Sequence, residues 1–282
     1  MVLQAVPGRG LWRFGTSVGW QRLESYMERK GMVDTERLKR ETEAARSVWN
    51  EHEDELHRAD NSHYRGVGRW ADDAKWQSIG KRTRADLERM LQFYNYPGDF
   101  WATPRTILEW GPGGGANAFA FRDVAKQFYG VDISEKNLEE CGRMLREEGS
   151  DMLRPVLIQE GLDEVAAAIE TPVDVFFSIA VFQHFPSKAY GEDVLRLMYD
   201  KMAAFSLGMV QIRYDNGNPR FKPIQSVEEY RKRHITATSY ALDEFHAILQ
   251  KIGFEDVFIT EIRPRSNYAF FHFRKGTPGA AG

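Results

Sequence analysis

The chain has 282 residues, a hydrophobic share of 42% and a formal net charge of -3, with 13% aromatic residues. This length suits one large domain or a domain with an extension. The slightly acidic balance argues against a constitutive nucleic-acid binder, which needs a basic footprint. A single cysteine, Cys141, excludes an internal disulfide and a Cys-based zinc site.

Two further features of the sequence bear on the location of the protein in the cell. The N-terminus has no basic segment followed by an apolar stretch, so no secretory signal is expected. No apolar run approaches the length of a membrane-spanning helix. The sequence therefore predicts a soluble, cytoplasmic protein without a membrane partner, and a homodimer is compatible with it.

Residues 1–100 are predicted to form a largely helical N-terminal extension that acts as a lid. Within it, the aromatic residues of segment 1–33 suggest an arm that packs on another part of the protein. A long charged helix is expected from 34 to about 57, and a second helix from about 83 to 94. The apolar stripe of the first helix consists of Leu38, Ala45, Val48, Trp49 and Leu56.

From residue 101 onward, predicted strands and helices alternate. The expected strands are 106–111, 128–133, 155–160, 173–180 and 208–214, and the helices between them are 115–126, 135–148, 166–169 and 187–204. A helix at 240–253 and strands at 257–262 and 268–273 close the domain. The link between the last two strands is too short for a parallel crossover, so an antiparallel hairpin is expected. The tail 276–282 is expected to be flexible.

A strand, a glycine cluster and a helix-forming segment follow one another around Gly111, Gly113 and Gly115. Glycine lets the backbone turn sharply and approach a ligand, because no Cβ stands in the way. At the carboxyl end of a parallel strand, such a turn binds a nucleotide-like ligand. Two interpretations stay open on the glycines alone. If the pattern is taken to end at Ala116, it fits the dinucleotide-binding fingerprint G-x-G-x-x-A. If it is taken to begin at Glu109, it resembles the S-adenosylmethionine-binding motif E-x-G-x-G-x-G.

The order of the motifs resembles that of the class I (Rossmann-like) S-adenosylmethionine-dependent methyltransferases. Residues 109–115 match the first motif of that family, Asp132 closes the second strand, and residues 174–184 look like the fourth motif. The resemblance covers about residues 75–275. It implies an α/β fold with a seven-stranded, mostly parallel doubly wound sheet whose last strand is antiparallel. The methyltransferase domain would span 101–275, with an insertion at about 214–240 near the substrate.

The resemblance also implies S-adenosylmethionine as cofactor and S-adenosylhomocysteine as product. Gly111 and Gly113 would approach the methionyl part and the ribose, and Gly115 would let the next helix pack tightly on the sheet. Glu109 would accept from the cofactor ammonium, whereas a dinucleotide site holds a pyrophosphate that an acid would repel. Asp132 would accept from both ribose hydroxyls, a role that an NAD site shares.

Further residues of the cofactor site follow from the same resemblance. Ile133 would lie against the adenine face, and Val181 would line the pocket after the fourth strand. Glu160 and Leu162 lie where the family holds the adenine edge. Trp76, at the entry to the helix before the sheet, is predicted to close over the cofactor.

His184 is the predicted catalytic residue, because neutral imidazole has a pKa suited to accept a proton from a substrate hydroxyl. A structural role for His184 is the alternative. Arg213, Tyr214 and His234 are the predicted substrate residues of the insertion. The basic run 231–234 could neutralise a substrate phosphate or carboxylate, or form a solvated helix surface. No ligand spacing supports a metal site.

The sequence predicts a methyltransferase that acts on a small molecule such as a secondary metabolite or saccharide. O-methylation is favoured, because the chain lacks the Asn-Pro-Pro-Tyr and Asp-Pro-Pro-Tyr motifs that mark amino-group methylation in some nucleic-acid enzymes. Two alternatives remain from this stage. One is an NAD(P)-dependent oxidoreductase, and the other is a catalytically silent cofactor-binding partner protein.

Overall fold

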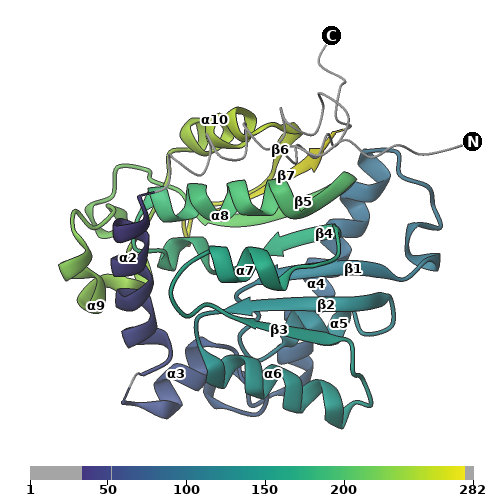
Figure 1. The fold of residues 1–282 in the computed structure, drawn as a ribbon, viewed down its shortest axis with the longest axis horizontal. Helices are drawn as coiled ribbons and strands as arrows, with labels where there is room; N and C mark the ends of the chain where they lie inside the picture. Colours follow the sequence, from purple (N-terminus) through teal and green to yellow (C-terminus); the bar gives the residue numbers. More distant parts are fainter. Residues whose placement is uncertain (1–33, 52, 277–282) are drawn as a thin grey trace, which may run out of the picture. The chain divides into compact units, whose positions relative to one another are not determined.

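A computed structural model describes residues 34–51 and 53–276 of the chain (Figure 1). Two predictions fall outside these residues, namely the packing of the arm 1–33 and the flexibility of the tail after Gly276. Within the described residues, no helix is both long and apolar enough to cross a membrane.

The described residues form one seven-stranded sheet with the order β3-β2-β1-β4-β5-β7-β6. Strands β1 to β5 run parallel, and β7 is antiparallel to both of its neighbours. The predicted fold class and the terminal hairpin are therefore confirmed. The strands are β1 (Arg105–Trp110), β2 (Ala125–Asp132), β3 (Leu153–Leu157), β4 (Val173–Ser178), β5 (Met202–Arg213), β6 (Phe254–Arg263) and β7 (Tyr268–Lys275).

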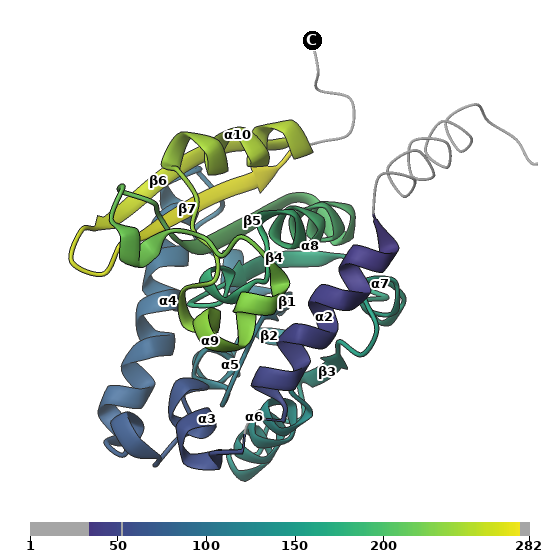
Figure 2. The ribbon, with the colours of Figure 1, turned by 90° about the vertical axis from the view of Figure 1, so that its left-hand side faces the viewer.

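Helices lie on both faces of the sheet, with α4 and α5 on one side and α7 and α8 on the other (Figures 1 and 2). The α-helices are α2 (Thr35–Trp49), α3 (Glu55–Asn61), α4 (Asp73–Phe93), α5 (Ala116–Ala120), α6 (Glu135–Glu147), α7 (Asp163–Ala168), α8 (Lys188–Lys201), α9 (Tyr230–Arg233) and α10 (Leu242–Ile252). Both faces of the parallel strands are covered, which explains why β4 reads as an almost continuous apolar run.

The predicted charged helix from 34 to 57 is two helices in the structure. Helix α2 ends at Trp49, and α3 begins after Asp54, whose carboxylate accepts from the backbone N–H of His57 at 2.9 Å. An aspartate at this position satisfies an N–H that has no partner within the helix. The break places Trp49 at the end of α2, where its side chain reaches the functional site described below.

Among the other predicted helices, two differ clearly from the structure in their bounds. Helix α4 begins at Asp73 rather than near 83, because Asp72 caps it by accepting from the N–H of Lys75. The predicted helix 115–126 is only the short α5, and the chain turns at Phe121 to enter β2 at Ala125. Pairing of β2 with β1 then takes up the backbone groups that a longer helix would have bonded internally.

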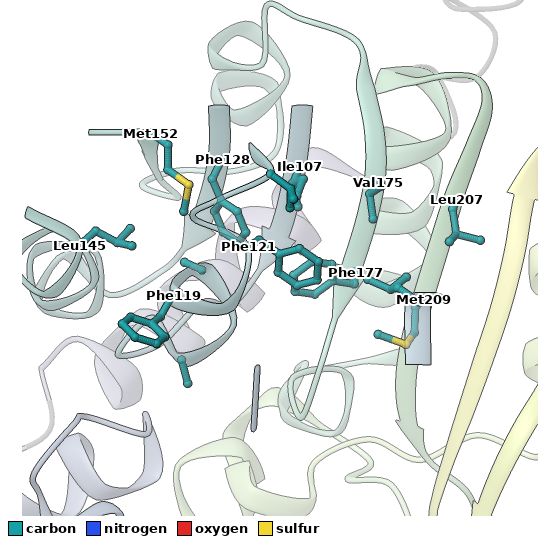
Figure 3. Close-up of a cluster of buried hydrophobic side chains, with 14 of the residues drawn as sticks. Ile107, Phe119, Phe121, Phe128, Leu145, Met152, Val175, Phe177, Leu207 and Met209 are labelled. Atoms are coloured by element: carbon teal, nitrogen blue, oxygen red, sulfur yellow. The ribbon is translucent and has the colours of Figure 1, made fainter. Parts of the chain in front are cut away.

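A cluster of buried hydrophobic side chains joins one face of the sheet to α4, α5 and α6. Figure 3 shows the strand residues Ile107, Phe128, Val175 and Phe177 packed around Phe121 in this cluster. Each fully buried side chain of this size stabilises the fold by about 1.5–3 kcal/mol. The core fixes the strand ends, and the order β2-β1-β4 brings the carboxyl ends of these three strands together at one edge.

Candidate functional site

A cavity opens at the carboxyl ends of β1, β2 and β4, with an empty volume of about 900 Å³ including the part exposed to solvent. Strand order reverses between β1 and β4, which is where ligands bind in open α/β sheets. Besides strand ends, the cavity is lined by α2, α8, α9 and the segment 61–63. Figure 2 shows α2 and α9 side by side, with α3 below them. The cavity size is that of a site for a small organic ligand.

The glycine loop needs glycine at the two positions that line the cavity. Gly111 has φ +80° and Gly113 has φ +51°, in the left-handed region that side chains disfavour. A Cβ on Gly111 would lie 2.4 Å from Cγ2 of Val181, and one on Gly113 would lie 2.4 Å from the carbonyl oxygen of Ser62. Any side chain here would displace the cavity wall.

Gly115 lies outside the cavity lining and serves packing instead. A Cβ at Gly115 would lie 2.7 Å from Cε of Met144 and 2.9 Å from Sγ of Cys141, both on α6. Gly115 was predicted to let the next helix pack closely on the sheet. In the structure it allows close packing against α6.

Glu109 is buried at the end of β1, with 1% of its surface exposed, and it lines the cavity. Nδ2 of Asn117 donates to its Oε1, but its Oε2 and the Oδ1 of Asn117 have no hydrogen-bond partner among the described residues. Burial raises the pKa of Glu109 to about 8, and the hydrogen bond from Asn117 opposes this shift. A buried acceptor without a partner is costly, so these two oxygens mark a place for a ligand donor.

Asn117 was missed by sequence reasoning. It lies on the short helix α5, whose first residues face the end of β1. The only signal in the sequence is a polar residue among the small apolar residues that follow the glycines. Whether the Asn117 side chain faces Glu109 depends on the residue at which α5 begins.

Asp132 ends β2 and lines the cavity beside the glycine loop. Its carboxylate accepts from the N–H of Ser134 at 2.9 Å and of Gly113 at 3.4 Å, and from Nδ2 of Asn137 at 3.3 and 3.4 Å. Burial raises the pKa of Asp132 to about 6, against these hydrogen bonds. The bonds hold the carboxylate in one orientation. Three of them are long, which leaves capacity to accept from a ligand.

Ile133 and Val181 both line the cavity, as does Ile158 after β3. Ile133 packs against a buried cluster that joins α2 to the insertion 214–240. The cluster consists of Ala45, Val48, Ile224, Tyr230 and Ala237, with Ala44 and Trp49 at its border. The helical extension and the insertion thus meet above the residue that was predicted to contact adenine.

Three predicted cofactor residues lie away from the cavity lining. Glu160 is exposed, and its N–H donates to the Glu164 side chain at 2.8 Å. Leu162 is buried beneath the start of α7. Trp76 is fully buried in the core cluster, with its ring edge-on to Phe119 at 5.4 Å. The hypothesis that Trp76 closes over the cofactor is therefore not retained, because the indole packs beneath the wall.

The segment 61–63, between α3 and α4, covers the glycine loop. The N–H of Gly114 donates to the carbonyl oxygen of Ser62 at 2.7 Å, and Nε1 of Trp76 donates to that of His63 at 2.7 Å. Both Ser62 and His63 line the cavity. No local sequence pattern predicts the contact between segment 61–63 and the glycine loop, since it depends on tertiary packing between segments about fifty residues apart in the sequence.

His184 lines the cavity after β4, in the turn Phe182–His184. Its Nδ1 lies 2.9 Å from the carbonyl oxygen of His234, so Nδ1 carries the proton. Its Nε2 lies 3.1 Å from Nε2 of Gln183, an amide donor, and its ring centroid is 4.8 Å from that of Trp49. Removal of the ring from water lowers the pKa of His184 to about 3, so the imidazole is neutral at pH 7.

The predicted substrate residues of the insertion do not line the cavity. The Arg213 guanidinium lies between the rings of Phe221 and Tyr268, 4.8 and 5.0 Å from their centroids. Tyr214 is buried, and its N–H donates to the carbonyl of Asn267 at 2.8 Å. The His234 ring packs edge-on to Trp49 at 5.5 Å. In the basic run, Arg231 and Lys232 are exposed on α9.

The charges around the cavity are few. Among the described residues that line it, the acidic side chains are Glu109 and Asp132, and neither lysine nor arginine is present. His63 and His184 both have a lowered pKa, about 4 and about 3, and are neutral at pH 7. Within residues 34–51 and 53–276, no group of three or more His, Cys, Asp or Glu side chains could hold a metal ion.

Comparison with known proteins agrees with this geometry. Residues 108–200, which run from β1 into α8, match the model of a family described as a methyltransferase domain. No curated protein matches the sequence. The match agrees with the methyltransferase resemblance and the enzyme class that were predicted from the motifs.

Solved structures show the fold over a longer stretch. Magnesium protoporphyrin IX methyltransferase from Synechocystis PCC 6803, solved with bound S-adenosylmethionine, is 14% identical, and the match covers 84% of this chain and 97% of that one with a TM-score of 0.55. Phosphoethanolamine N-methyltransferase 2 from Haemonchus contortus is 15% identical, with 68% of this chain and 53% of that one covered and a TM-score of 0.49.

Proposed function

Starting from a methyltransferase domain of this fold, we propose that the protein transfers a methyl group from S-adenosylmethionine to a hydroxyl of a small, uncharged molecule. The observation that carries this proposal is the cavity itself. Two buried carboxyl groups, Glu109 and Asp132, lie beside its glycine loop. The rest of its wall is mainly aromatic and apolar, with two neutral histidines and neither lysine nor arginine among the described residues.

The residues of the cofactor half fit the donor. Oε2 of Glu109 and Oδ1 of Asn117, both without a partner among the described residues, would accept from the ammonium group of the methionyl part. Asp132 would accept from the ribose hydroxyls, and Ile133 would pack against adenine. When bound, the donor supplies a methyl group on a positively charged sulfur, which makes the carbon electrophilic. An unpaired carboxylate at Glu109 suits this cationic ligand better than a pyrophosphate.

The acceptor half would be built by the extension and the insertion. Trp49 of α2, Tyr190 of α8 and Tyr230 of α9 line the cavity with Phe185. These side chains would exclude water and hold a flat acceptor in line with the methyl group. Methyl transfer needs an in-line nucleophile at about 3 Å, so positioning dominates the rate enhancement.

The absence of lysine and arginine from the described lining bears on the acceptor. A buried phosphate or carboxylate needs a cationic partner, and an unpaired one is costly. The basic run 231–234 does not supply it, because these side chains lie outside the cavity lining. A neutral histidine with a bare ring nitrogen in this lining can accept a hydroxyl proton, which favours O-methylation. A neutral secondary metabolite with a phenol fits this wall better than a polar saccharide.

The division of the chain follows from this proposal. Residues 101–275 would hold the cofactor, and residues 1–100 would form the lid on the acceptor side, together with the insertion 214–240. The cytoplasmic location and a homodimer stay predictions.

Calorimetric titration tests the cofactor assignment. We expect S-adenosylhomocysteine to bind to the full chain, and NAD and NADP to give no heat of binding. Binding of a nicotinamide nucleotide alone would overturn the assignment of S-adenosylmethionine as cofactor and would favour the NAD(P)-dependent oxidoreductase.

A second experiment tests the acceptor class. The full chain is incubated with methyl-labelled S-adenosylmethionine and a matched panel of neutral phenols and their phosphate esters. We expect label only in the phenols. Label in the phosphate esters would contradict the uncharged acceptor. Binding of S-adenosylhomocysteine with no labelled product from the panel or a cell extract would favour the silent cofactor-binding protein.

A further inference from the structure

We propose that His63, in the segment that covers the glycine loop, is the catalytic residue that takes the proton from the acceptor hydroxyl. This inference rests on the proposed function and adds a residue to it. It differs from the prediction made from sequence, which assigned this role to His184. The two histidines line the same cavity from different segments, so their surroundings can be compared directly.

The backbone of His63 is held in an unfavourable conformation by its segment. Its φ is +59°, in the left-handed region that a non-glycine residue adopts only at a cost. Hydrogen bonds fix the segment on both sides, from Gly114 to the carbonyl of Ser62 and from Trp76 to the carbonyl of His63, each at 2.7 Å. A strained residue fixed in a ligand cavity points to a function for its side chain.

The ring nitrogens of His63 and His184 differ in their hydrogen bonds. Both ring nitrogens of His184 already have partners, the carbonyl of His234 and the amide of Gln183. The ring of His63 packs edge-on to Trp70 at 4.5 Å, and no described residue hydrogen-bonds its nitrogens. One nitrogen of a neutral imidazole is a bare acceptor. His63 therefore keeps an acceptor for a substrate, whereas His184 has its acceptor occupied.

Burial, more than the charged neighbours, keeps the ring of His63 neutral. Removal from water lowers the pKa of His63 to about 4, the nearby Arg69 adds to this, and Asp60 opposes it. Arg69 and Asp60 form an ion pair with each other at 2.6 Å. A proton on His63 would also lower the pKa of His184, because the two positive charges would repel. A neutral base is thus present throughout the physiological range.

A lone pair of the acceptor oxygen forms the new O–C bond while the S–C bond of the donor breaks and its electron pair stays on sulfur. As the O–C bond forms, the hydroxyl becomes strongly acidic, and its proton passes to the bare nitrogen of His63. The proton then leaves to solvent, and the products are the methyl ether and uncharged sulfur.

The test uses the full chain labelled with ¹⁵N-histidine, with His63→Asn and His184→Asn as a matched pair. Asparagine tolerates the left-handed backbone better than most other non-glycine residues, so His63→Asn is expected to fold and to bind S-adenosylhomocysteine within about twofold of wild type. The two variants assign the ring nitrogens by loss of their signals. Phenol and 2-naphthol are the probes, added to the complex with S-adenosylhomocysteine.

We expect the probes to shift the ¹⁵N signal of the bare ring nitrogen of His63 and to leave the ¹⁵N signals of both ring nitrogens of His184 unchanged. Shifts at His184 alone, or at neither residue, would overturn the assignment while cofactor binding stands. If S-adenosylhomocysteine itself fails to bind to wild type, the proposed function fails instead. With a phenol that the wild type methylates, His63→Asn should lower kcat about 100-fold or more. A His63→Gly variant should regain part of that loss with added imidazole.

Discussion

The two halves of the cavity are built by different means. The cofactor half consists of strand ends and the glycine loop, and its polar groups, Glu109 and Asp132, are fixed by hydrogen bonds to nearby backbone and side chains. The acceptor half consists of helices and loops far apart in the sequence, brought together by aromatic packing and a few side-chain hydrogen bonds. In the proposed site, cofactor binding would thus depend on short local segments, whereas acceptor choice would depend on tertiary contacts between distant segments.

The largest effect is expected from a side chain at the loop of the cofactor half. Gly113→Ala places a Cβ 2.4 Å from the backbone oxygen of Ser62 and should abolish measurable S-adenosylhomocysteine binding in calorimetry. Gly149→Ala is the matched control, because Gly149 also has positive φ but nothing lies within 4 Å of its Cβ position. It should lose about 1 kcal/mol of stability and no affinity. Equal affinity in both variants would place the ligand elsewhere.

A smaller loss is expected from Asp132→Ala, which removes an acceptor for the ribose hydroxyls. Loss of charge-assisted hydrogen bonds should weaken S-adenosylhomocysteine binding by about 1–3 kcal/mol. Glu160→Gln provides the control, since Glu160 is exposed outside the cavity lining and its replacement should leave the affinity unchanged. Unchanged affinity in Asp132→Ala would refute the ribose assignment.

The pH dependence of binding sharpens the role of Glu109. Its pKa is raised to about 8, so the carboxyl is mainly protonated at pH 7 and must ionise to bind an ammonium group. The affinity for S-adenosylhomocysteine should therefore rise by up to about tenfold per pH unit until the pH reaches that pKa. Glu109→Gln should retain only the dependence that comes from the ligand amino group. A matching pH profile for both proteins would exclude Glu109 from ammonium binding.

The same shift affects the stability of the unliganded protein. Because the folded-state pKa lies above the ordinary value of 4.5, the contribution of Glu109 is fully present below pH 4.5 and is lost as the pH rises through about 8. Urea unfolding at pH 6 and pH 9 checks this, and Glu109→Gln should show a smaller difference between the two.

The smallest effect is expected in the acceptor half. The Tyr230 hydroxyl accepts from Nε1 of Trp49 at 3.0 Å and donates to the carbonyl of His184 at 2.6 Å. Tyr230→Phe should therefore reduce the free energy of unfolding by about 1–2 kcal/mol in urea titration, with S-adenosylhomocysteine affinity unchanged. A large loss of affinity would show that the two halves are not separable.

This contrast also explains what the sequence could predict. The alternation of strands and helices predicted a mostly parallel α/β sheet, and the motifs located Glu109 and Asp132, because each depends on neighbours close in the sequence. Asn117, Ser62 and His63 were missed, since their directions depend on a short helix and on packing between distant segments. Trp76 was assigned to the cavity, but burial in the core decided its position.

The hydrogen bond from Gly114 to Ser62 has a consequence for protein engineering. A chimera that exchanges the first hundred residues with those of another methyltransferase would change the acceptor wall and the cover of the glycine loop at once. A graft limited to α2, with its junction after Trp49, would keep the backbone partner of Gly114 in place. Acceptor preference could then be altered by directed evolution in one helix while the affinity for the methyl donor is inherited unchanged.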